Sequence, residues 1–187
     1  LDILLLTNAY YPEINITKGQ FLNLKSNWLI KNSNLELIEE YLLNNQIINE
    51  NPKLLKYLVD EHLSRSEIQK SCEIFSKITE PIEDDYLSKF NIYCLIRNNK
   101  PDEAQLLIDL KKEAGFTEKF FEDKINYLMG YEDKPEKNIS EKTILDFHLS
   151  HRTNPEFKFE PKDTTSKKIW KYLSTSNLLD DIQVIEL

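Results

Sequence analysis

Apolar side chains recur at helical spacing along most of this 187-residue chain. From about residue 20 to residue 130, leucine, isoleucine and phenylalanine return every three or four positions, as expected for one face of an α-helix. Short polar breaks divide this stretch into seven segments. The apolar stripes of these segments include Phe21, Leu35, Leu54, Ile68, Leu87, Leu107 and Phe120. The pattern therefore predicts seven helices before residue 131 and an all-α fold.

Several segment ends carry residues that start or stop helices. Asn34 can cap the second helix, because its side-chain oxygen can accept a hydrogen bond from a free N–H of the first turn. Pro52 suits the first turn of the third helix, where its missing N–H costs nothing. Gly115 and Gly130 are typical of the position just beyond a helix C-terminus. These signals predict helix pairs joined by short turns.

The fifth segment, from about residue 84 to residue 98, is apolar over most of its circumference. A helix of this kind usually lies at the centre of a domain, because each of its sides needs apolar neighbours. We therefore expect the fifth helix in the middle of the fold.

The organisation of the chain changes after residue 130. Residues 131–140 are polar and charged, which predicts a linker or an exposed loop. Short helices are expected over about 141–150 and around Trp170. Residues 156–160 alternate apolar and polar, but without a partner run they do not predict a sheet. We expect one domain over 1–187, with a repeat core over 20–130 and with a linker and C-terminal cap over 131–187.

The spacing of the helix pairs is close to a repeat. Leu37, Ile68 and Ala104 fall at equivalent positions of second helices and lie 31 and 36 residues apart, near the period of two-helix repeats. From Asn91 to Ala104 the chain has an aromatic residue, a turn and an acidic residue followed by alanine. In these features it resembles tetratricopeptide-like helical-repeat proteins. The resemblance implies about four antiparallel helix pairs stacked into a short right-handed α-solenoid with an irregular C-terminal cap.

The charge of the chain restricts its partners. It carries 24 lysines and arginines against 32 acidic residues, a net charge of −8, so we expect no nucleic-acid partner and no binding to anionic membranes. The one dense basic cluster is Lys167, Lys168 and Lys171, which we interpret as a solvated helix face rather than a phosphate site. The apolar run over residues 3–6 is too short to span a bilayer, so no membrane insertion is expected.

Two cysteines, Cys72 and Cys94, are too few for a disulfide scaffold and lack the Cys-x-x-Cys spacing of zinc or redox sites. Each lies among apolar residues, where a thiolate would be poorly solvated. The sequence therefore predicts two free, buried thiols that react slowly.

The chain offers few candidates for chemistry. With three glycines it cannot build a glycine-rich phosphate loop, and it contains no common catalytic motif. His148 and His151 would share a helix face, with Asp146 and Glu141 nearby, and could in principle hold a metal in a small enzyme. We favour a structural interpretation for both histidines, and for His62 at the edge of the core. No cofactor, metal or catalytic residue is predicted.

One stripe of side chains suits partner binding. Tyr86, Lys89, Tyr93 and Arg97 recur every three or four residues on the fifth helix, and Tyr57 takes the matching place on the third. Tyrosine and arginine are common interface anchors. We expect the stripe at the centre of the concave side, although the tyrosines could instead pack between helix pairs.

These observations favour a non-enzymatic protein–protein interaction module or scaffold that binds another protein or a peptide. The alternative is a non-catalytic superhelical domain of a larger enzyme, such as a periplasmic cell-wall lytic enzyme. The compartment and the partner stay open.

Overall fold

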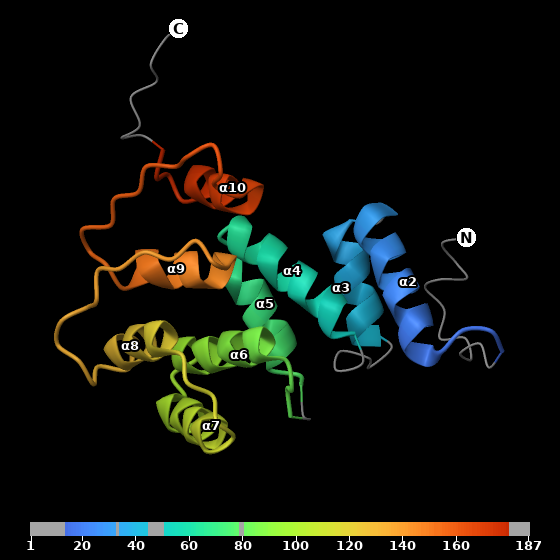
Figure 1. The fold of residues 1–187 in the computed structure, drawn as a ribbon, viewed down its shortest axis with the longest axis horizontal. Helices are drawn as coiled ribbons and strands as arrows, with labels where there is room; N and C mark the ends of the chain where they lie inside the picture. Colours follow the sequence, from blue (N-terminus) through green and yellow to red (C-terminus); the bar gives the residue numbers. More distant parts are fainter. Residues whose placement is uncertain (1–13, 33, 45–50, 79–80, 180–187) are drawn as a thin grey trace, which may run out of the picture.

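The computed structural model describes residues 14–32, 34–44, 51–78 and 81–179. Within these ranges the chain forms nine α-helices and no β-strand, which confirms the predicted all-α fold. The helices in chain order are α2 (Lys18–Asn32), α3 (Leu35–Asn44), α4 (Pro52–Ser64), α5 (Ile68–Phe75), α6 (Asp85–Arg97), α7 (Pro101–Glu113), α8 (Lys119–Leu128), α9 (Ile144–Arg152) and α10 (Lys167–Thr175), as Figure 1 shows. Residues 131–140 and 156–160 are irregular, as expected for a loop and for an unpaired run. The apolar run at residues 3–6 lies outside the described residues.

The predicted helix ends are present. The Asn34 side-chain oxygen accepts from the Leu37 backbone N–H at 2.8 Å, a cap that contributes about 1 kcal/mol. Gly115 and Gly130 follow α7 and α8 with φ of 89° and 78°, a region that costs glycine no Cβ clash. Asn99, in the turn between α6 and α7, takes the same left-handed region with φ of 56°.

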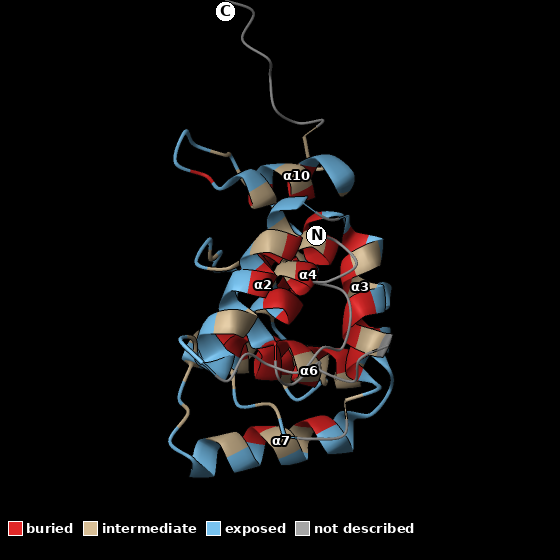
Figure 2. Cartoon of the chain, turned by 90° about the vertical axis from the view of Figure 1, so that its right-hand side faces the viewer, coloured by how far each residue is buried: buried red, intermediate tan, exposed pale blue. Residues whose placement is uncertain are grey.

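Helix α4 lies at the centre of the packing and contacts six others: α2, α3, α5, α6, α9 and α10. Its side chains Leu54, Leu58, Val59 and Leu63 are fully buried, because neighbouring helices cover it on several sides. Helix α6 is the second centre, and α7 packs along its outer side (Figures 1 and 2). The prediction of a central fifth helix agrees with the burial of α6.

The C-terminal helices pack against helices from earlier in the chain. Helix α10 packs on α4, and α9 packs on α4 and α8 (Figure 1). The Thr175 hydroxyl donates to the Ser64 carbonyl at 3.0 Å, across 111 positions of sequence. Leu145, Phe147 and Leu149 of α9 are fully buried in the same apolar core as α4. The described C-terminal helices therefore share the apolar core of α4.

The prediction of free cysteines is wrong. Cys72 on α5 and Cys94 on α6 form a disulfide, with their Cα atoms 5.2 Å apart. The predicted burial of both sulfurs is correct, since the residues are 1% and 2% exposed. Spacing placed each cysteine on the apolar stripe of its own helix, but it could not indicate that the two stripes face each other. The bond closes a loop of 22 positions, which corresponds to about 3 kcal/mol of stabilisation in the chain-entropy treatment.

Candidate functional site

The predicted partner-binding stripe of α6 faces the interior of the protein. Tyr86, Lys89 and Tyr93 are 6%, 6% and 2% exposed, so the expectation that they point outward is wrong. The physical reason is that the chain's own helices, α4 and α9, cover this face of α6. Arg97, at the C-terminal end of α6, is exposed and lies 6.0 Å from the centre of the Tyr93 ring. Tyr57 on α4 is half-buried and packs against the core.

Four polar aromatic side chains, three of them buried and the fourth half-buried, form a hydrogen-bonded chain between α6, α9 and α10. The Tyr93 hydroxyl lies 2.7 Å from His148 Nε2, and His148 Nδ1 lies 2.9 Å from the Tyr172 hydroxyl. The same hydroxyl lies 2.7 Å from His151 Nδ1. Burial, with smaller effects of nearby positive charge, lowers the pKa of His148 to about 3, so its ring is neutral. A neutral ring donates through one nitrogen and accepts through the other, so His148 donates to one of the two tyrosine hydroxyls and accepts from the other.

The hydrogen bonds of His148 and His151 show how far these two residues could serve as metal ligands. Both nitrogens of His148 already face tyrosine hydroxyls, and Nδ1 of His151 faces the Tyr172 hydroxyl as well. Glu141 accepts a hydrogen bond from the Thr165 hydroxyl at 2.9 Å instead of joining the histidines. Among the residues that the structure describes, no three histidine, cysteine or acidic side chains gather in a way that could hold a metal ion. The geometry therefore gives the two histidines a structural role.

A charged cluster lies beside the aromatic chain. Lys89 Nζ is 2.9 Å from Glu118 Oε2 and 3.6 Å from Asp146 Oδ1. Asp146 is 1% exposed, and no group in the described part of the chain donates a hydrogen bond to its carboxylate oxygens. Burial raises the pKa of Asp146, while the positive charge of Lys89 opposes the rise. Lys89 thus links α6 to α9 and to the residue before α8.

Two lysines of the basic cluster on α10 form ion pairs with α4. Lys168 Nζ lies 2.5 Å from Asp60 and Lys171 Nζ lies 3.0 Å from Glu61, both on α4. The other Asp60 oxygen accepts from the Tyr86 hydroxyl at 2.5 Å. Burial, together with the Asp60 carboxylate, raises the pKa of Tyr86 well above its ordinary value. Two of the three lysines therefore serve to hold α10 on α4, a role that their spacing did not reveal.

His62 occupies a similar internal position. Its Nε2 lies 2.5 Å from Glu39 of α3, and its Nδ1 lies 3.2 Å from Glu67 in the turn before α5. The residue is 1% exposed, whereas we expected only the edge of the core. The two carboxylates come from other helices and turns, so the sequence around His62 carried no signal of this arrangement.

Two other surfaces remain open to solvent. An open groove runs along the outer face of α2 and is lined by Asn15, Ile16, Gln20, Asn23, Leu24, Asn27, Trp28, Lys31 and Asn32. On α7, Leu106 and Leu110 are 59% and 51% exposed. Leu24 and Trp28 continue the three- to four-residue spacing of Phe21, so the sequence pattern places them on a helix stripe and gives no sign of an open surface.

Comparison of the chain with known protein families, curated proteins and solved structures gave no significant match. Among the described helices, none combines the length and apolar character that a membrane crossing requires.

Proposed function

We propose that this chain is a non-enzymatic, tetratricopeptide-like helical-repeat module that binds another protein, with its helix pairs stacked as a short right-handed α-solenoid. The order of the helices supports this proposal. Short turns join α4 to α5 and α6 to α7, and each of these pairs packs together. Stacked pairs with short turns offer mainly a shaped surface.

The outer face of α7 is the observation that carries the proposal. Ala104 and Ile108 bury one side of this helix against the core, while Leu106 and Leu110 lie on its exposed side. Residues four apart on a helix are neighbours, so the two leucines form one apolar patch. Figure 2 shows the exposed side of α7 at the edge of the molecule. A patch of adjacent large apolar side chains is the kind of surface on which a partner gains binding energy.

The test compares the proteins captured by the tagged chain and by the double variant Leu106→Ser, Leu110→Ser. We expect both to melt at the same temperature, because the two side chains are largely outside the core. We expect the double variant to lose a partner that the unchanged chain retains. Ile139→Ser, at a 37% exposed loop position, is the matched control. An identical set of captured proteins from all three chains would contradict a binding role for α7.

One observation favours the second candidate, a non-catalytic superhelical domain of a larger exported enzyme. A buried disulfide joins Cys72 to Cys94, and disulfides persist mainly in oxidising compartments such as the periplasm. The native protein should be isolated with an alkylating reagent present from the moment of lysis. Two unmodified cysteines before reduction, and two modified ones after it, would support export. Immediate modification of both would remove the support for this candidate.

A further inference from the structure

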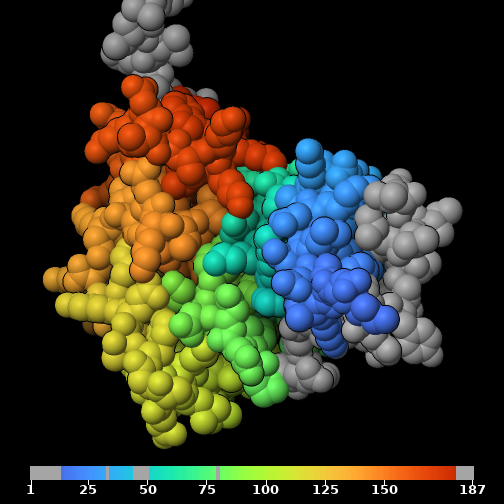
Figure 3. All heavy atoms as spheres, turned by 45° about the vertical axis from the view of Figure 1, so that its right-hand side comes forward, coloured from blue at the N-terminus to red at the C-terminus, as the bar shows by residue number. Residues whose placement is uncertain are grey.

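We propose that the groove along α2 binds an extended acidic segment of a partner protein. The inference rests on the proposed function, because it assigns a partner chemistry to a second surface of the same module. Figure 3 shows α2, in blue, on an outer face of the molecule. None of the described helices covers the groove side chains, which belong to the open lining given above.

The first group of the groove is the Gln20 amide. Gln20 and Thr17 form a capping box at the start of α2: the Thr17 backbone N–H donates to Gln20 Oε1 at 2.9 Å, and the Gln20 backbone N–H donates to Thr17 Oγ1 at 3.2 Å. Because a backbone N–H can only donate, the amide oxygen of Gln20 must face it. The NH2 group of Gln20 is then left for another acceptor.

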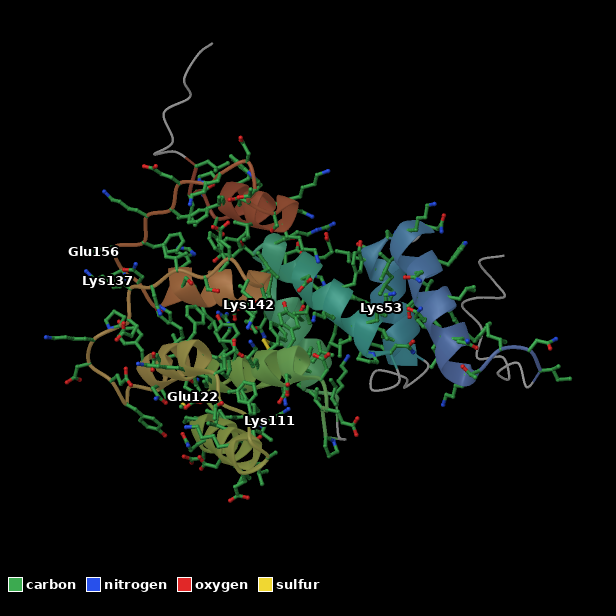
Figure 4. The ribbon with its side chains drawn as sticks, viewed as in Figure 1. Lys53, Lys111, Glu122, Lys137, Lys142 and Glu156 are labelled. Atoms are coloured by element: carbon green, nitrogen blue, oxygen red, sulfur yellow. A yellow bond between two sulfur atoms is a disulfide. The ribbon has the colours of Figure 1, made fainter. Side chains whose placement is uncertain are left out.

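The next two groups are the amides of Asn23 and Asn27. Lys53, on α4, places its Nζ 2.7 Å from Asn23 Oδ1 and 2.6 Å from Asn27 Oδ1 (Figure 4). An ammonium group has donors only, so both amide oxygens must face it. The NH2 groups of both asparagines therefore point away from Lys53, as that of Gln20 points away from Thr17.

The result is a row of three NH2 donors at steps of three and four residues along one helix face. No acceptor for these NH2 groups occurs among the described residues. Lys31 lines the groove, the Lys53 ammonium lies against Asn23 and Asn27, and none of the lining residues is acidic, although the whole chain has a net charge of −8. A row of donors in a locally basic region suits a ligand that brings acceptors and negative charge, namely carboxylates and backbone carbonyls.

Two apolar side chains beside the row favour a peptide over other anionic polymers. Leu24 is 56% exposed, and Trp28, which is half-buried and packs against the core, also lines the groove. Their exposed parts can pack against an apolar side chain of the ligand. A segment that alternates acidic and apolar residues meets both requirements.

The experiment uses a fluorescent peptide of repeated Glu-Glu-Leu triplets and the purified chain. The decisive variant is Gln20→Glu, Asn23→Asp, Asn27→Asp, which replaces the NH2 donors with carboxylate oxygens of the same shape. It preserves the fold, because a carboxylate at position 20 keeps the capping box and the carboxylates at positions 23 and 27 form ion pairs with Lys53. We expect the unchanged chain to bind the peptide and the triple variant to bind it about tenfold more weakly or worse, since like charges then oppose each other.

The control is Gln69→Glu, Asn138→Asp, Asn177→Asp, which adds the same charge at exposed positions outside the groove. It should bind within about twofold of the unchanged chain at physiological salt, because distant surface charges are screened. The chain has two tryptophans, so in a Trp170→Phe background the emission of Trp28 should change on binding and place the peptide in the groove.

Three results would overturn the proposal: no peptide binding by the unchanged chain, equal weakening by the control variant, or tighter binding of a carboxylated oligosaccharide than of the peptide. These results are separable from failure of the proposed function. If capture of a natural partner still depends on Leu106 and Leu110, the module binds proteins and only the assignment of the α2 groove is wrong.

Discussion

Tyr93 on α6 and His148 on α9 lie 55 positions apart in the sequence, and the tyrosine hydroxyl is 2.7 Å from Nε2 of the histidine. Both side chains are buried, and their rings meet edge to face with centroids 5.3 Å apart. This contact joins α9, near the C-terminal end of the described chain, to α6. It also occupies the face of α6 that sequence analysis assigned to a partner protein.

The hydrogen bond of Tyr93 should contribute to stability. Tyr93→Phe keeps the ring but removes the hydroxyl, which leaves His148 Nε2 buried without its partner. We expect the free energy of unfolding, from urea titration, to fall by about 1 to 2 kcal/mol. Tyr131→Phe, at a 59% exposed position, is the control and should have no effect. Equal stability of the two variants would mean that the Tyr93 hydroxyl contributes nothing to the fold.

The buried neutral ring of His148 should make stability depend on pH. Its pKa in the folded protein is lowered from 6.5 to about 3, chiefly by burial. Between these values the unfolded chain binds a proton that the folded chain does not. The free energy of unfolding should therefore fall as the pH drops from about 6.5 toward 3, by at most about 1.4 kcal/mol per pH unit from this group.

Urea titrations of the unchanged chain and of His148→Gln across this range measure the contribution. The variant should lose less stability on acidification, because glutamine does not titrate. Parallel curves for the two proteins would show that His148 is not the group responsible.

Replacing Lys89 should lower the stability of the protein more than replacing an exposed lysine near the same cluster. Lys89→Met removes the cation that faces both Glu118 and the buried Asp146, so it leaves a buried carboxylate without an opposite charge. We expect a loss of about 3 kcal/mol or more in the free energy of unfolding at pH 7. Lys142→Met, which removes an exposed lysine 3.8 Å from Glu118, is the control and should cost far less.

Asp146→Asn should make the protein more stable at neutral pH, whereas Lys89→Met should make it less stable. Because burial raises the pKa of Asp146 in the folded state, its contribution to stability is present at low pH and lost as the pH rises through that pKa. Asparagine does not titrate, so the variant should gain stability relative to the unchanged chain between about pH 4 and pH 8. The comparison of thermal melting at these two pH values checks the sign. A relative loss at the higher pH would show that the ion pair with Lys89 outweighs burial.

The Cys72–Cys94 bond should stabilise the fold by joining α5 to α6. Reduction, or the double variant Cys72→Ser, Cys94→Ser, should lower the free energy of unfolding by about 3 kcal/mol, since the unfolded chain then gains conformational freedom. Melting with and without dithiothreitol measures the effect. The double variant is the control for the reagent and should melt at the same temperature in both buffers. If the unchanged chain melts at the same temperature before and after dithiothreitol, and the reagent is shown to have broken the bond, the prediction is contradicted.

The amino-acid pattern alone was enough to locate the helices. The signals are local: apolar side chains return every three or four residues, Asn34 caps α3, and Gly115 and Gly130 supply positive φ after α7 and α8. A helix and its ends depend on neighbours within a few positions, so spacing alone could place them. The same reasoning correctly put Tyr86, Lys89 and Tyr93 on one face of α6.

Which residues cover that face of α6 depends on how the helices pack. Spacing defines a face but not its partner, and α9 reaches α6 from about 55 positions further along the chain. The same holds for Cys72 and Cys94, whose stripes meet between two helices, and for Lys168, which finds Asp60 at a distance of 108 positions. Contacts of this kind depend on how whole helices pack. The hydrophobic effect rewards the burial of any apolar area, so it does not specify which distant residue will cover a given helix face. The donor row of the α2 groove is a further case, since it exists only because Lys53 of α4 orients two amides of α2.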